Sequence, residues 1–83
     1  MKALSYREAQ VCAQMANGLS NEEIGVYLRL SANTIKTHVR RILAKLGADN
    51  RTHAAAILVA RGLVREDGGV FVPASLNLTS LSA

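Results

Sequence analysis

The chain is 83 residues long, which suits a single domain. Apolar residues make up 49% of it and aromatic residues only 4%, so we expect an aliphatic core of packed helices. The formal net charge of +4 is too mild to decide the class of partner. No apolar stretch is long enough to cross a membrane, and the N-terminus lacks the apolar core of a signal peptide. The single Cys12 can form no internal disulfide or metal cluster, so we expect a core hydrophobe in a reducing cytoplasm.

Two capping boxes predict the first two helices. Ser5 followed by Glu8 marks the start of a helix that runs to Asn17, where Asn17-Gly18 ends it. Ser20 followed by Glu23 starts a second, short helix that ends near residues 27–28. A glycine inside this helix, Gly25, costs stability, so we expect another helix backbone to pass close to it.

The third helix is predicted most clearly, from Ala32 to Leu46 after a cap at Ser31. Its apolar residues recur at helical spacing and form one stripe: Ile35, Val39, Ile42, Leu43 and Leu46. The other side carries several cations and no acid between residues 36 and 45, which is the charge pattern of a phosphate-binding face.

A fourth helix is predicted from Arg51 to Arg61, capped by Asp49 or Asn50. Its apolar residues surround it almost completely, so a second copy of the chain is the simplest cover for the side that leaves the core. From Val64 onward the composition changes. We expect residues 65–83 to form a loosely ordered tail in which Phe71 docks against a domain of residues 1–64.

Two short helices joined by a tight turn, the second of them cationic, have the plan of a helix-turn-helix. Five motifs occur in order along residues 4–64: L-S-x-R-E, G-L-S-N-x-E-I, S-x-x-T-I-K-T-H-V, I-L-x-K-L-G and R-T-x-A-A. With these motifs the chain resembles the C-terminal DNA-binding domain of LuxR/NarL/GerE-type transcription regulators. The resemblance implies an all-α, four-helix LuxR-type helix-turn-helix domain that binds double-stranded DNA with residues 32–46 in the major groove.

The resemblance also implies roles for individual residues. Base edges would be met by Lys36, Thr37 and Arg40. Phosphates would be met by Thr34, His38, Lys45 and, as a further candidate, Arg41, with Ser20 and Asn21 on the DNA backbone at the start of the second helix. The fourth helix would form a homodimer through Ala54, Ile57, Leu58 and Arg61.

The chain departs from the family pattern in several places. Tyr6 and Gln10 differ from the residues that are usual in the family, and these differences should affect local packing only. Arg29 lies in the inter-helix turn, where it could reach a phosphate. Val26 and Tyr27 stand where polar residues are usual, so they leave an apolar patch for a partner protein or the C-terminal tail. Most family members carry an N-terminal regulatory domain. Because the first helix follows so soon after the first residue, we expect a short stand-alone member, associated with the nucleoid.

A second hypothesis keeps the scaffold but uses it as a protein-interaction module on RNA polymerase, a sigma factor or another regulator. An enzyme is the least favoured hypothesis, since the sequence has no glycine-rich phosphate loop, metal-ligand cluster or nucleophile-base pair. No cofactor or metal is expected.

Overall fold

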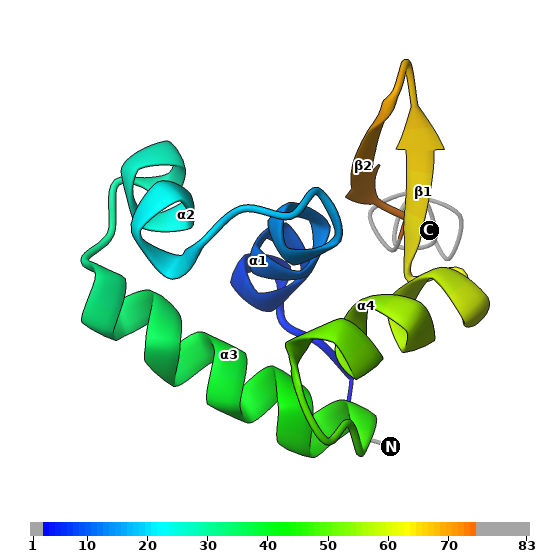
Figure 1. Ribbon diagram of the computed structural model, residues 1–83, viewed down its shortest axis with the longest axis horizontal. Coiled ribbons are helices and arrows are strands. Elements are labelled where there is room, and N and C mark those ends of the chain that lie inside the picture. The colour runs from blue at the N-terminus through cyan, green and yellow to red at the C-terminus, as the bar shows by residue number, and fades with distance from the viewer. Residues whose placement is uncertain (1–2, 75–83) are drawn as a thin grey trace.

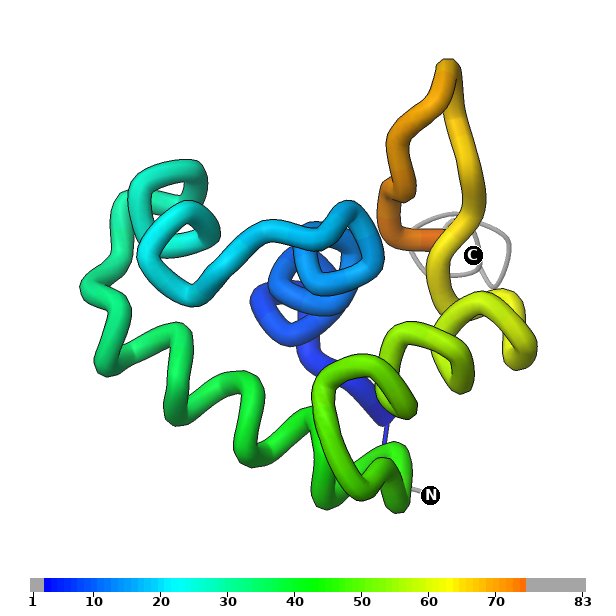
Figure 2. Tube along the Cα trace, viewed as in Figure 1, coloured from blue at the N-terminus to red at the C-terminus, as the bar shows by residue number. Residues whose placement is uncertain are grey.

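Four helices and one β-hairpin make up the computed structural model, which describes residues 3–74 (Figure 1). The elements are α1 (Tyr6–Ala16), α2 (Asn21–Leu28), α3 (Ala32–Leu46), α4 (Arg51–Ala60), β1 (Val64–Asp67) and β2 (Val70–Pro73). Helix α1 lies in the middle, with α2 and α3 on one side and α4 and the hairpin on the other (Figure 1). The chain trace shows the N-terminal segment approaching α1 past the end of α3 (Figure 2). The four predicted helices are confirmed, but the prediction of a purely helical fold is wrong because of the hairpin.

Side-chain caps start each helix. The Ser5 hydroxyl accepts from the Glu8 amide and the Glu8 carboxylate accepts from the Ser5 amide, at 3.1 and 2.9 Å. Ser20 and Glu23 form the same reciprocal pair at the start of α2, so both predicted capping boxes are confirmed. Helix α4 is capped by Asn50, whose side chain accepts from an amide of its first turn.

The core is aliphatic and is shared by all four helices. The stripe on α3 is buried at Ile35, Val39, Ile42 and Leu46, and it meets buried residues of α1, α2 and α4. Cys12 is only 1% exposed, and burial, followed by the negative charge of Glu8, raises the pKa of its thiol to about 12. A thiol with this pKa stays protonated, so Cys12 packs as a small hydrophobe, as predicted.

The junction between α2 and α3 depends on Gly25. A Cβ at this position would lie 2.5 Å from the carbonyl oxygen of Leu30 and 3.5 Å from the backbone nitrogen of Ala32. The backbone that passes close by is therefore the inter-helix turn and the start of α3. The Gly25 carbonyl accepts from the Leu30 amide at 2.8 Å, and Arg29 takes a left-handed conformation to close the turn.

The segment after α4 corrects the prediction of a loosely ordered tail. Residues 64–73 form an antiparallel hairpin with Val64 opposite Pro73 and Glu66 opposite Phe71. Gly68 and Gly69 both have positive φ, as a two-residue hairpin turn of type I′ requires. Val64 is buried, and the predicted docking of Phe71 is confirmed, since its half-buried side chain packs against the core. The predicted domain boundary after residue 64 falls inside β1, and the rest of the predicted tail, residues 75–83, lies outside the described residues.

Asn17, at the end of α1, ties the hairpin to the helices. Its Nδ2 donates to the Phe71 carbonyl at 3.0 Å, and its Oδ1 accepts from the Phe71 amide at 2.7 Å. The residues that flank a two-residue turn bond to each other, so Phe71, one residue further on, directs both backbone groups away from β1. The Asn17 amide thus bonds β2 where a neighbouring strand otherwise would.

The close approach at Gly25 predicts that Gly25→Ala lowers the free energy of unfolding by at least about 2–3 kcal/mol, because a methyl group would overlap backbone that cannot rotate away. Urea denaturation followed by circular dichroism measures the change. Val26→Ala is the matched control, since Val26 is 82% exposed on the same helix, and we expect it to change stability by less than about 0.5 kcal/mol. Equal stability of Gly25→Ala and the parent protein would contradict the close approach.

The contact between Asn17 and β2 predicts that Asn17→Ala costs about 1–3 kcal/mol, because it leaves two backbone groups of Phe71 without partners. Hydrogen exchange should also quicken at the amides of Val70 and Phe71. Asn17→Asp keeps the acceptor for the Phe71 amide but sets an oxygen against the Phe71 carbonyl, so we expect it to fall below the parent protein as well. Unchanged exchange in the hairpin of both variants would show that Asn17 does not hold it.

Candidate nucleic-acid interface

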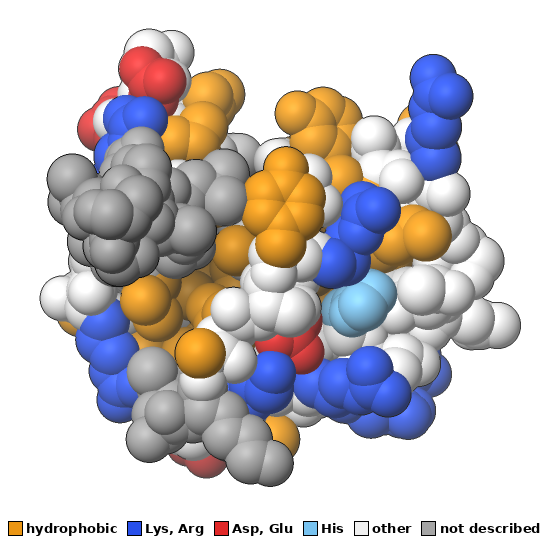
Figure 3. Space-filling model, turned by 180° about the vertical axis from the view of Figure 1, so that it is seen from behind, with side chains coloured by type: hydrophobic (Ala, Val, Ile, Leu, Met, Phe, Trp, Pro, Cys, Tyr) orange, Lys and Arg blue, Asp and Glu red, His pale blue; other side chains and the backbone are white. Residues whose placement is uncertain are grey.

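The solvent-exposed side of α3 is a cationic surface. Lys36 and Arg40 lie one turn apart on it, and Thr37 and Arg41 lie one turn apart beside them, all exposed. Among residues 3–74, no carboxylate forms an ion pair with Lys36, Arg40 or Arg41. Figure 3 shows Lys and Arg side chains gathered along the lower edge of the molecule, with acidic side chains at the upper corner and a few more near the centre and the lower edge. These cations are therefore available for an external anion.

Two threonines complete this surface. The Thr34 hydroxyl is 2.9 Å from the hydroxyl of Ser31 at the start of α3. The Thr37 hydroxyl donates to the Asn33 carbonyl at 3.2 Å, which fixes the side chain while its methyl group and oxygen stay exposed. Both threonines are exposed on the side of α3 that carries the cations.

His38 lies at the edge of the cationic surface and is half-buried. Its Nδ1 atom is buried and has no hydrogen-bond partner among the described residues. One nitrogen of the ring therefore faces the protein interior, so a contact with an external group would have to use the other nitrogen, Nε2.

Lys45 contacts the protein itself. Its ammonium donates to the Glu8 carboxylate at 2.6 Å and to the Ala3 carbonyl at 3.2 Å. Burial by itself raises the pKa of Glu8, but the hydrogen bond from Lys45, the hydrogen bonds from Ser5 and the Lys45 charge outweigh it, so the net pKa is below its usual value. Lys45 thus joins α3 to α1, whereas the sequence placed it on a phosphate, and the role of Glu8 beyond its capping box was missed.

Ser20 and Asn21, the two remaining residues predicted to contact the DNA backbone, lie at the start of α2. The Ser20 hydroxyl is used by the cap, and Asn21 is half-buried with its Oδ1 accepting from Arg51 of α4 at 2.7 Å. Arg29 is exposed in the turn between α2 and α3. The sequence analysis named Asn21 as a candidate DNA contact but could not predict its bond to Arg51, because the two residues are 30 positions apart and no local pattern joins them.

The predicted dimer contacts divide into buried and exposed residues. Ala54 and Leu58 are 0% exposed, so they pack in the core and cannot reach another chain, which corrects that part of the prediction. Ile57 is half-buried against the core and Arg61 is exposed. The side of α4 that faces solvent also carries Val59, which is 50% exposed and was not predicted. The apolar run had no clear periodicity, so the sequence did not tell which residues face inward.

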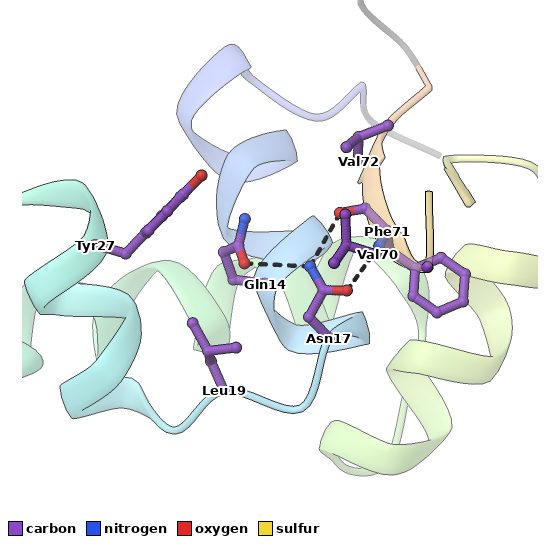
Figure 4. A pocket seen from close by; sticks show the side chains of 8 residues that line it. Gln14, Asn17, Leu19, Tyr27, Val70, Phe71 and Val72 are labelled. Carbon is purple, nitrogen blue, oxygen red and sulfur yellow. Dashed lines mark hydrogen bonds between the residues drawn. The ribbon is translucent and has the colours of Figure 1, made fainter. Parts of the chain in front are cut away.

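A hollow of about 460 Å³ separates α2 from the hairpin. Tyr27 forms one wall and β2 the other, with Gln14, Asn17 and Leu19 between them (Figure 4). Tyr27 and its neighbour Val26 are 66% and 82% exposed, so the predicted apolar patch on α2 is confirmed. The hairpin, which the sequence did not predict, makes Tyr27 of this patch one side of a groove.

Residues 3–74 bring together no group of three or more His, Cys, Asp or Glu side chains that could hold a metal ion. No helix within that range is long and apolar enough to span a membrane.

The Lys45–Glu8 pair makes stability depend on pH. Because the folded-state pKa of Glu8 is lowered, its carboxylate stabilises the fold above the unfolded-state pKa, and this contribution is lost as the pH falls through the folded-state value. We expect Glu8→Gln to lower the unfolding free energy by about 1–3 kcal/mol at neutral pH. The difference from the parent protein should shrink at an acidic pH below the lowered folded-state pKa of Glu8, where the parent carboxyl is also neutral.

Urea denaturation at the two pH values measures this difference. Glu22→Gln is the control, since Glu22 is an exposed acid that makes no ion pair within residues 3–74. A loss for Glu8→Gln that is the same at both pH values would assign the effect to packing instead of charge.

The sequence is similar to a known family of bacterial proteins. Residues 2–58 match the family described as bacterial regulatory proteins, luxR family. The chain is 48% identical over 59 residues to the uncharacterized transcriptional regulatory protein YxjL of Bacillus subtilis, covering 71% of this chain and 27% of that protein. It is 47% identical over 60 residues to the uncharacterized transcriptional regulatory protein YhcZ of the same organism, covering 72% and 28%.

The fold matches as well. A crystal structure of the response regulator ChrA, of a heme-sensing two-component system, superposes with a TM-score of 0.71 at 39% identity, covering 75% of this chain and 31% of that one. The chain thus spans less than a third of the length of these relatives. On the match of residues 2–58, and on the helices that those residues form, the chain belongs to the luxR family of bacterial regulatory proteins.

Proposed function

We propose that this chain is a sequence-specific binder of double-stranded DNA that regulates transcription, with α3 in the major groove. The observation that carries this function is the cationic surface of α3, which is exposed and makes no ion pair within residues 3–74, opposite a stripe fixed in the core. A major groove admits one α-helix with its side chains, and α2 would cross the DNA backbone and set the angle of approach.

The side chains of this surface have different chemistry. Lys36 and Arg40 can donate to guanine edges, and Thr37 can contact a base edge through its hydroxyl or methyl group. Thr34 and Arg41, at the margins of the surface, suit phosphates, as does Nε2 of His38. Lys45 is held by Glu8, so it contributes to the interface by fixing the end of α3.

The protein would act as a homodimer on an inverted repeat. The residues that support this part of the proposal are the exposed Val59 and the half-buried Ile57 of α4, with Arg61 at the end of the helix. An isologous dimer presents two copies of α3 related by a two-fold axis, and the half-sites of the DNA would repeat that symmetry.

A second candidate function is protein binding through the groove between α2 and the hairpin, with RNA polymerase or another regulator as the partner. The exposure of Val26 and Tyr27 and the hollow beside them favour it. In this case the helix-turn-helix would serve as a scaffold, and charge alone would account for any binding to DNA.

Selection from random duplex DNA at near-physiological salt, followed by sequencing, tests the two functions. We expect an enriched motif with inverted symmetry. Lys36→Ala or Arg40→Ala should then cost about 1–3 kcal/mol, concentrated at particular base pairs. Arg65→Ala is the matched control, since it removes the same charge from the hairpin, away from α3.

Two results would contradict DNA regulation. One is the absence of any enriched motif, with binding that disappears as salt rises, because non-specific contacts behave in this way. The other is an equal loss for Arg65→Ala and Arg40→Ala, which would show that total charge alone sets the affinity. Loss of activity in cells for Tyr27→Glu, with DNA binding weak and unselective, would favour protein binding instead.

A further inference from the structure

The first residue of α4 reaches back to the start of α2. Arg51 donates from Nη2 to the Leu19 carbonyl and from Nη1 to Oδ1 of Asn21, both at 2.7 Å. These two acceptors flank Ser20, the residue that caps α2. A guanidinium holds its donors in a rigid plane, so two short, charge-assisted bonds fix the start of α2 with respect to α4.

The contact also decides which way the Asn21 amide points. A guanidinium has donors only, so the Asn21 side chain must present its oxygen to Arg51. The amide nitrogen Nδ2 is then directed away from Arg51, and within residues 3–74 it makes no hydrogen bond. The neighbouring Ser20 hydroxyl accepts from the Glu23 amide in the cap and keeps its own O–H hydrogen, so Nδ2 of Asn21 lies beside the Ser20 hydroxyl as a side-chain donor at this end of α2.

A phosphate oxygen can only accept hydrogen bonds, so the direction of this amide matters for DNA binding. We propose that Arg51 is a positioning residue that turns Asn21 so that its Nδ2 donates to a DNA phosphate beside α2. The inference rests on the proposed DNA-binding function and goes beyond it by assigning a role to Arg51, on the helix that the proposed dimer uses. Without Arg51 the amide can rotate and present its oxygen, which a phosphate repels.

The charges nearby make such a device useful. Glu22 and Glu23 follow Asn21 in the first turn of α2 and are exposed, so this end of the helix carries two negative charges that would oppose a phosphate. Arg51 adds a positive charge next to them while remaining half-buried and bonded to the protein. Arg51 therefore acts in two ways: it orients the neutral amide donor of Asn21, and it offsets the negative charge of the two glutamates.

The test measures DNA affinity and thermal stability for variants of the full chain, on the motif obtained by selection. Asn21→Ala should weaken binding about tenfold, which corresponds to one hydrogen bond to a charged group. The dependence of affinity on salt should not change, because a neutral donor releases no counterion. Asn21→Asp keeps an acceptor for Arg51 and nearly the same size, so we expect unchanged or higher thermal stability with a larger loss of DNA binding.

A double-mutant cycle then separates positioning from general stability. Arg51→Ala should weaken binding by at least as much as Asn21→Ala, and adding Asn21→Ala to it should change affinity less than about twofold. If Arg51→Ala does not fold, Arg51→Lys takes its place in the cycle. A lysine can bond to the Leu19 carbonyl or to Oδ1 of Asn21, but it lacks the planar pair of donors that holds both. A neutral methylphosphonate placed at each backbone position in turn should weaken the parent protein at one phosphate beside α2 and leave Asn21→Ala unaffected there.

The outcomes distinguish this inference from the function on which it rests. Additive losses for Arg51→Ala and Asn21→Ala, or a methylphosphonate pattern that is the same in the parent and in Asn21→Ala, would overturn the role of Arg51 while DNA binding stands. Failure of the parent protein to bind any duplex above the level set by charge would contradict the proposed function, and this inference with it.

Discussion

The rest of this structure depends on the distance between two stretches of backbone at Gly25. Since a hydrogen atom is all that fits there, α2 lies directly against the turn that leads into α3. The angle between the two helices follows from that contact, because neither the helix nor the turn can move without separating backbone from backbone. The buried apolar stripe of α3 then faces α1 and α4, and the cations on the opposite side of α3 must face solvent. One missing methyl group thereby determines where the charged surface lies.

The same structure keeps negative charge away from that surface. Glu8, the one buried acid among residues 3–74, is neutralised by Lys45 at the end of α3, and the remaining acids lie on α2, in the loop before α4 and on the hairpin. Lys45 is therefore an anchor between α1 and α3 and is not one of the free cations of that surface. An ion pair between Lys45 of α3 and Glu8 of α1 thus holds the direction of the cationic helix, while Lys36, Arg40 and Arg41 remain available.

Local patterns in the sequence predicted the helices because the signals are local as well. Ser5 with Glu8 and Ser20 with Glu23 mark helix starts within four residues, and the stripe of α3 repeats within one helix. Contacts between distant residues have no such signal, so Glu8 with Lys45 and Arg51 with Asn21 could not be predicted. The hairpin was missed because Glu66 to Gly69 resembles a loop, and its strands depend on Asn17 and on the core under Phe71 for their stability. The apolar run of α4 has no clear periodicity, so it could not be predicted that Ala54 and Leu58 face inward.

The way in which β2 is bonded has a consequence for association between chains. A strand at the edge of a sheet normally offers unpaired amides and carbonyls to any other extended chain. On β2 the outward groups of Phe71 are taken by Asn17, and Pro73 has no amide hydrogen to offer. The two-stranded sheet therefore cannot grow on this side, and a crowded solution of the protein is protected there from strand-by-strand aggregation.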